Sequence, residues 1–147
     1  MRFASSPTSY SLFRNTRSAV KGFPRRKLIT YPLDAPVEYN NHKASENNLG
    51  ALLCPETILQ QDSKTQWTKI DPRINWLSDK LQQLYPVKVL IIAAQATTAL
   101  DIAQHLKMRE GIHASVFHED MSIVERDRAA AFFADMEDGS QALICSE

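Results

Sequence analysis

The feature that most constrains the fold is an alternation of apolar runs with helical patterns in the second half of the chain. The first run, Val87–Ala94, is apolar except for Lys88, which is typical of a strand buried on both faces of a parallel sheet. The alternation continues with a helix over Thr97–Arg109 that ends at Gly111, a strand at His113–His118, a helix over Ser122–Asp135 and a strand at Gln141–Cys145. Because helices separate the strands, we predict an α/β fold with a parallel sheet and right-handed crossovers.

A further helix is expected before the first strand. Asp71 is a candidate N-cap, Pro72 occupies the first helical position, and Pro86 ends the pattern. The apolar stripe of this helix is Ile74, Leu77, Leu81 and Leu84. In the helix over 97–109, the side chains expected to face the core are Leu100, Ala103 and Leu106, with Ile102 as a further candidate. We interpret Trp67 and Trp76 as core or interface anchors rather than as a platform for stacking bases.

Ligands of parallel sheets collect at the carboxyl ends of the strands. Those ends are predicted at Ala94–Gln95, His118–Asp120 and Ser146–Glu147. After the second of them, Ser122 and Glu125 have the spacing of a capping box at a helix start. Such a start directs free N–H groups and the positive end of the helix dipole at one point, where phosphate can bind. Most capped helix starts bind only water, so both interpretations stay open.

Other chemistry at this turn is weakly indicated. His118, Glu119 and Asp120, with Cys145 and Glu147, are residue types that bind metals, but consecutive residues rarely point at one ion. We therefore predict no metal site. His118 and Glu119 could exchange protons, but no activated nucleophile accompanies them. Arg126 and Arg128 lie off the apolar stripe of their helix, where arginine is usually solvated.

The charge of the chain is unevenly distributed. Residues 1–33 contain seven bases and no acid, which leaves ten bases and all 17 acids for the remainder. A basic arm of this kind resembles an organellar transit peptide, or a segment that contacts phosphates or an acidic protein. Cys54 and Cys145 have no paired spacing for zinc or redox chemistry. The chain contains no Gly-x-x-x-x-Gly-Lys-[Ser/Thr] loop and no acidic box, so we predict neither a nucleotide triphosphate site nor any catalytic or cofactor-binding residue.

Several separate blocks of the sequence together resemble one known family. The blocks outside the predicted strands are Leu12–Arg17, Val20–Arg26, Pro55-Glu56, Asp71-Pro72-Arg73 and Trp76-Leu77. The blocks within the alternating region are Lys88–Leu90, Ala99-Leu100, Ala114–Ala131 and Leu143–Glu147. These blocks resemble the bacterial SWI/SNF-type ATPases that associate with RNA polymerase, rather than helicases at large. The resemblance covers nearly everything from Leu12 onward. Since the basic arm matches an internal segment of the family, its similarity to a transit peptide is compositional.

The resemblance implies an internal slice of a longer protein with two RecA-like lobes that clamp ATP and grip duplex DNA. Residues 1–11 are expected to be disordered and 12–70 to form an inter-lobe segment with short helices and extended pieces. Residues 71–147 would be the N-terminal half of the second lobe, a partial RecA-like lobe behind a largely irregular basic segment. ATP and Mg²⁺ would be bound by other parts of the family protein, so no cofactor is expected here.

The resemblance also implies candidate nucleic-acid contacts. The turn and helix at 118–128 correspond to a helicase motif on the nucleic-acid side, and Ser146-Glu147 match the start of the next motif. The candidate nucleic-acid-binding residues are His118, Ser122, Arg126 and Ser146. The family has glycine where this chain has Asp120, whose charge would oppose a phosphate. Glycine could also take positive φ there, although aspartate tolerates that region too.

We therefore expect part of an ATP-driven DNA translocase that binds RNA polymerase and promotes its recycling, located in the bacterial cytoplasm. The expected partners are DNA, RNA polymerase and the remainder of the ATPase chain, without a membrane. This chain alone is expected to lack ATPase activity. Two alternatives stay open: a non-catalytic module that binds nucleic acid or polymerase through the basic arm, and an inert truncated remnant.

Overall fold

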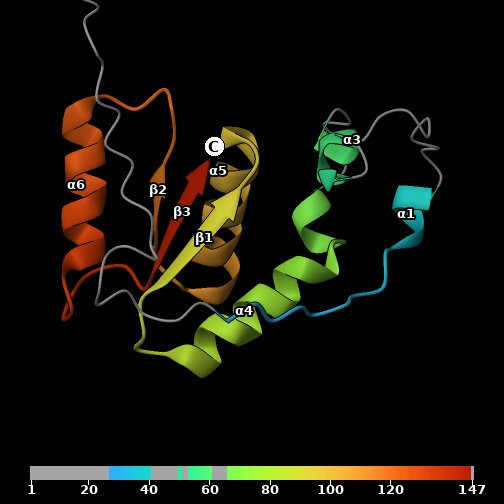
Figure 1. Cartoon of the computed structure of the whole chain (residues 1–147), viewed down its shortest axis with the longest axis horizontal. Coiled ribbons are helices and arrows are strands. Elements are labelled where there is room, and N and C mark those ends of the chain that lie inside the picture. The colour runs from blue at the N-terminus through green and yellow to red at the C-terminus, as the bar shows by residue number, and fades with distance from the viewer. Residues whose placement is uncertain (1–26, 41–49, 51–52, 61–65, 147) are drawn as a thin grey trace, which may run out of the picture. The chain divides into compact units, whose positions relative to one another are not determined.

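The computed structural model describes residues 27–40, 50, 53–60 and 66–146, and its main compact unit begins at Leu33. The helices and strands of this unit are shown in Figure 1. Before the sheet come α1 (Val37–Asn40), α3 (Glu56–Gln60), a 3₁₀ turn η1 (Trp67–Lys69) and α4 (Pro72–Leu84). The sheet region consists of β1 (Val89–Ala93), α5 (Ala96–His105), a π-helical turn η2 (Leu106–Glu110), β2 (Ala114–Phe117), α6 (Ile123–Ala134) and β3 (Ala142–Ser146).

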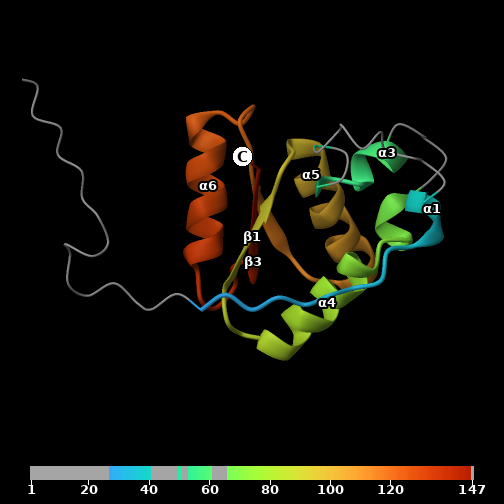
Figure 2. The ribbon, with the colours of Figure 1, turned by 45° about the vertical axis from the view of Figure 1, so that its right-hand side comes forward.

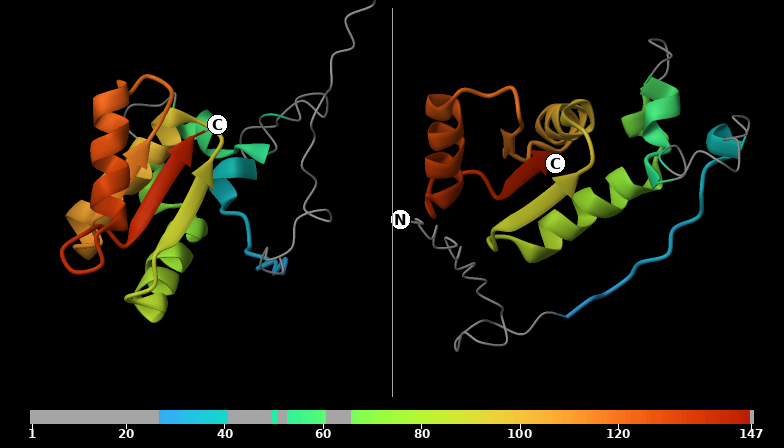
Figure 3. Two further views of the ribbon diagram at one scale, coloured as in Figure 1. Left: turned by 60° about the vertical axis from the view of Figure 1, so that its left-hand side comes forward. Right: turned by 45° about the horizontal axis from the view of Figure 1, so that its top comes forward.

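The three strands form a parallel sheet in the order β1-β3-β2, so the predicted α/β class is confirmed (Figure 3). The register pairs Ala93 of β1 with Ser146 of β3, and Phe117 of β2 with Cys145 of β3. Figure 2 shows the sheet nearly edge-on, with α5 on one face and α6 on the other. This is half of a doubly wound arrangement and is consistent with a partial RecA-like lobe.

The predicted start of α4 is confirmed. The carboxylate of Asp71 accepts a hydrogen bond from the backbone N–H of Arg73, and Pro72 is the first helical residue. In the predicted stripe, Ile74 and Leu81 are buried while Leu77 is half-buried against the core. Trp67 is also a core residue, as predicted.

Two expectations about burial are wrong. Leu100 was expected to face the core but is 46% exposed, whereas its helix buries Ala99, which was not expected, and the further candidate Ile102. The first strand is not buried on both faces: Leu90 and Ile92 are 58% and 68% exposed. The reason is that α6 packs against β2 and β3, so within the described residues no helix covers the β1 end of that face.

The connections between elements also differ in detail from the prediction. The helix expected to run to Arg109 is α-helical only to His105 and then widens into the π turn η2. Gly111 ends it with φ of +67°, the left-handed conformation that glycine adopts without steric cost. Gly139, between α6 and β3, has a different requirement, since a Cβ there would lie 2.1 Å from the carbonyl oxygen of Phe132. None of the described helices is long and apolar enough to cross a bilayer.

Candidate functional site

The carboxyl ends of β2 and β3 form the polar edge at which the sequence placed a site. A hydrogen bond joins them: the Ser146 hydroxyl donates to Oε2 of Glu119 over 2.8 Å. The backbone N–H of Glu119 and the Ser146 hydroxyl lower the pKa of the Glu119 carboxyl. Glu119 was considered only as a metal ligand or proton carrier, so its role as the tie between the two strand ends was missed.

Arg126 is folded back over this turn. Its Nη2 donates to the carbonyl oxygen of Glu119 over 2.7 Å, and its guanidinium carbon lies 5.4 Å from the centroid of the Phe117 ring. Both contacts hold the guanidinium beside the strand ends rather than in open solvent. Its Nε is buried and has no hydrogen-bond partner within the described residues. Arg126 therefore keeps donor capacity for a further acceptor at this edge.

Ser122 begins α6 with the predicted capping box, which is confirmed. The Ser122 hydroxyl accepts from the Glu125 backbone N–H over 3.3 Å, and the Glu125 carboxylate accepts from the Ser122 backbone N–H over 2.8 Å. The Ser122 hydroxyl also donates to the Glu125 carboxylate over 2.7 Å, and this bond together with the one from the Ser122 backbone N–H lowers the pKa of the Glu125 carboxyl. The hydroxyl is thus engaged with its own helix. The N–H groups of Ile123 and Val124 donate to no acceptor in the described parts of the chain and are among the free N–H groups of the helix start.

His118 and Asp120 complete the turn. The Nδ1 atom of His118 is buried and makes no hydrogen bond in the portion of the chain described, while Asp120 is exposed. No described residue other than glycine has positive φ, so Asp120 does not adopt the left-handed conformation. Asp120 therefore adds a negative charge to a turn whose backbone does not require glycine.

The four candidate residues lie together at the carboxyl ends of β2 and β3, but their hydrogen bonding differs. Ser122 and Ser146 make hydrogen bonds within the chain, whereas Arg126 and His118 each retain an unpartnered nitrogen. Carboxylates stand close to all of them, so the local charge is mixed. Such an edge can donate hydrogen bonds to a phosphate or another oxyanion. Repulsion by the neighbouring carboxylates would lower the affinity for that anion. No cluster of potential metal ligands is found among the residues with a described placement.

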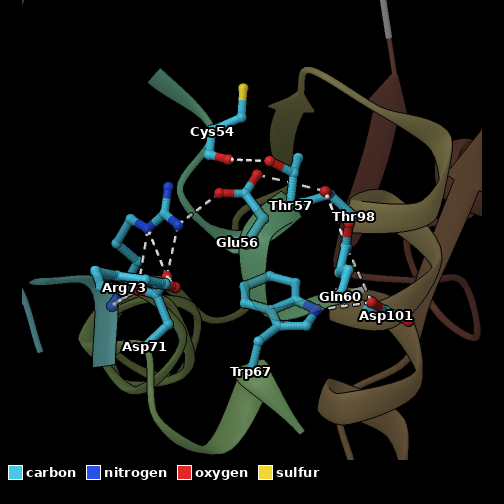
Figure 4. A network of polar contacts seen from close by, with 10 residues as sticks. Cys54, Glu56, Thr57, Gln60, Trp67, Asp71, Arg73, Thr98 and Asp101 are labelled. Atoms are coloured by element: carbon cyan, nitrogen blue, oxygen red, sulfur yellow. Dashed lines mark hydrogen bonds and ion pairs between the residues drawn. The ribbon is translucent and has the colours of Figure 1, made fainter. Parts of the chain in front are cut away.

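A second polar cluster, which the sequence did not reveal, connects the segment before the sheet to α4 and α5 (Figure 4). Arg73 bridges two buried carboxylates: its Nη2 lies 2.5 Å from Oδ2 of Asp71 and 2.8 Å from Oε2 of Glu56. Tyr39 donates from its hydroxyl to Asp71 over 2.5 Å. Burial alone would raise the pKa of the Asp71 carboxyl, but hydrogen bonds from Arg73 and Tyr39 lower it below its usual value. We call these four residues the Arg73 network.

The Arg73 network was missed because its members are 34 positions apart at most and follow no periodic pattern. Beside it, Trp67 donates from Nε1 to Oδ2 of Asp101 over 2.7 Å, and Gln60 donates to the same oxygen over 3.1 Å. These bonds attach α3 and η1 to α5. The sequence signal nearest to this network is the Asp71-Pro72-Arg73 run, which by itself predicts a helix start.

No family model matches the chain. The RNA polymerase-associated protein RapA of Pseudomonas syringae pv. syringae strain B728a is 54% identical over 144 residues. The RapA proteins of Pseudomonas putida strain F1 and Pseudomonas aeruginosa strain LESB58 are each 52% identical, over 144 and 145 residues. Each alignment covers 95% of this chain and 15% of the relative. The expected resemblance is confirmed: along 95% of its length the chain is a relative of the RNA polymerase-associated protein RapA, of which it spans about 15%.

Proposed function

We propose that this chain supplies the opening half of the second RecA-like lobe of a SWI/SNF-type, ATP-dependent DNA translocase that associates with RNA polymerase and promotes its recycling. Two observations support the proposal. The relatives carry the name RNA polymerase-associated protein, and the sheet with α5 and α6 on opposite faces is consistent with such a lobe. The bacterial cytoplasm is the proposed location.

The single observation that carries the proposal is the polar edge held together by Glu119. The Ser146–Glu119 bond fixes the end of β3 against the turn after β2, and Arg126 is held beside both. The N–H groups of Ile123 and Val124 open on the same turn. Together these donors suit contact with the phosphate backbone of duplex DNA, which positions a protein without reading sequence.

Within this proposal the candidate residues have distinct roles. Arg126 contacts a phosphate through its guanidinium, which is held at this edge, and the imidazole of His118 offers a second contact. Ser122 and Ser146 act through the chain itself, by holding the helix start and the Glu119 side chain. The chain binds neither ATP nor Mg²⁺ by itself, since its sequence has no phosphate-binding loop or acidic box.

A second candidate is a non-catalytic module that binds nucleic acid or polymerase through the basic arm. It is favoured by the seven bases and the absence of acids in residues 1–33, whose structure lies largely outside the described residues. The third possibility, an inert remnant, predicts neither a cooperative thermal melt nor DNA binding. The two binding hypotheses differ in the residues that provide the affinity for DNA: Arg126 at the strand ends in the first, and the arginines and lysines of the basic arm in the second.

The test is the affinity of the full chain for duplex DNA, measured by fluorescence anisotropy over a series of salt concentrations. Arg126→Gln is compared with Arg128→Gln, an exposed arginine on the same helix. Loss of one phosphate contact should reduce the slope of log affinity against log salt by about 1 for Arg126→Gln only. If instead Arg25→Gln with Arg26→Gln removes the binding while Arg126→Gln does not, the arm is the binding element and the proposed edge is wrong.

Asp120 offers a separate test of the same edge. Asp120→Asn removes the charge and keeps the side-chain size, so it should tighten DNA binding by about fivefold, equivalent to about 1 kcal/mol. Asp120→Gly should give the same gain, because the turn does not use positive φ. Unchanged affinity and salt slope in both variants would mean that the turn does not face the DNA backbone. An ATPase assay with DNA present should show no turnover, and turnover would overturn the assignment of ATP binding to other parts.

A further inference from the structure

An open pocket of about 720 Å³ lies beside α5, on the side that faces η1 and the end of α3. Its lining combines cationic side chains, Lys69 and Arg109, with the amides of Gln66 and Gln104 and the thioether of Met108. None of these residues belongs to the polar edge at the strand ends. The pocket is therefore a separate feature of the molecule, and its interpretation does not rest on the proposed function.

Among the described residues of the lining, Lys69 and Arg109 outweigh the one acid, Asp101, so the described lining carries a net positive charge. Neither Lys69 nor Arg109 forms an ion pair with any residue whose placement is described. The acid in the lining, Asp101, is engaged by Trp67 and Gln60, whose N–H groups both donate to its Oδ2. Burial lowers the pKa of His105, Glu110 acts against this, and the charges of Arg109 and Lys69 lower it further. An anion in the pocket would relieve this accumulation of positive charge.

The chemistry of the lining favours a peptide over a nucleic acid. Recognition of single-stranded bases relies on exposed aromatic faces, but the aromatic ring of the lining, Trp67, is only 4% exposed. Gln66 and Gln104 are exposed amides of the kind that pair with a peptide backbone. Met108 is 72% exposed and offers an adaptable apolar contact. The volume is also far larger than a single phosphate requires.

We propose that this pocket binds an acidic peptide segment of a partner protein, with Lys69 and Arg109 contacting its carboxylates and Met108 an apolar side chain. The amides of Gln66 and Gln104 bind the peptide backbone between these points. The chain would thus have a protein-binding surface whose residues are distinct from those of its candidate DNA-binding surface.

The experiment is fluorescence anisotropy of the full chain with a short labelled peptide of alternating glutamate and leucine. A peptide in which glutamine replaces glutamate is the neutral reference. Lys69→Gln and Arg109→Gln should each weaken binding of the acidic peptide by about two- to fivefold, the effect of losing one exposed charge contact. Lys107→Gln is the matched control, because Lys107 is an exposed cation in η2 that does not line the pocket. Met108→Ser should weaken binding of both peptides.

The outcomes of these measurements distinguish a peptide-binding pocket from a nucleic-acid contact and from a small-anion site. The proposal is overturned if the acidic peptide binds no better than the neutral one, or if Lys107→Gln weakens binding as much as Lys69→Gln. Competition by duplex DNA that depends on Lys69 and Arg109 would identify a nucleic-acid contact instead, and competition by inorganic phosphate at equal concentration would identify a small-anion site. Circular dichroism of each variant establishes that the exposed substitutions leave the fold intact, and the DNA affinity through Arg126 serves as an independent readout.

Discussion

Replacing Arg73 by glutamine should destabilise the chain more than any other single loss of a charge described above. The substitution leaves the carboxylates of Asp71 and Glu56 without their cation, although their exposed fractions are only 1% and 3%. Breaking a fully buried ion pair costs about 3–5 kcal/mol, and an exposed pair less than about 1 kcal/mol. Because the Arg73 side chain is 44% exposed, water screens part of the interaction, and we expect a loss of about 2 kcal/mol.

The measurement is urea unfolding followed by circular dichroism, where a loss of this size lowers the midpoint by about 1 M. Arg128→Gln is the control, since Arg128 is exposed on α6, and it should change the free energy of unfolding by less than about 0.5 kcal/mol. The double variant of Arg73→Gln with Glu56→Gln should be less destabilised than the sum of the single variants, by about 1 kcal/mol. Equal midpoints for Arg73→Gln and Arg128→Gln would refute the view that the Arg73 network attaches α3 to α4.

Three further predictions concern stability. Since the pKa of the Asp71 carboxyl is lowered in the folded chain, its ionised form contributes fully to the free energy of unfolding above about pH 4, the usual aspartate pKa. This contribution is lost as the pH falls below that value. The urea midpoint should therefore decrease less steeply on acidification in Arg73→Gln than in the parent chain. Gly139→Ala should cost about 1–3 kcal/mol, because its Cβ would collide with backbone oxygens of Phe132 and Asp135, and a thermal melt equal to that of the parent would contradict the close approach. Ser122→Ala should cost about 1 kcal/mol through loss of the N-cap, whereas Ser122→Asp should retain most of the stability in the same melt.

The local elements could be predicted because their signals lie within a few residues of each other. Asp71 and Ser122 cap their helices as expected, and Gly111 ends η2 in the left-handed conformation. The exposure of Ile92 could not be predicted, since an apolar strand sequence does not record whether a helix covers both faces. The π turn after His105 was also missed, because its residues have the same composition as an α-helix.

The position of the candidate site could be predicted from the sequence, but the hydrogen bonds between its residues could not. Parallel topology placed the ends of β2 and β3 together, as expected from the pattern of elements. The Glu119–Ser146 hydrogen bond joins residues 27 positions apart, and no local pattern specifies it. Likewise, Arg73 meets Glu56 only because α3 lies against the start of α4, which is a consequence of tertiary packing. The assignment of residues 12–70 and 71–147 to separate parts of a two-lobed protein stays a prediction.

The order of the strands has a consequence for how the chain folds. β1 and β2 are not neighbours, and each pairs only with β3 in the described sheet, although β3 is the last of the three to be synthesised. Until Ala142–Ser146 has left the ribosome, the two earlier strands therefore have no hydrogen-bonding partner in this sheet. Sheet formation must then be a late event that closes two long loops at once, which is slow and exposes apolar strands such as β1 to other chains in the meantime.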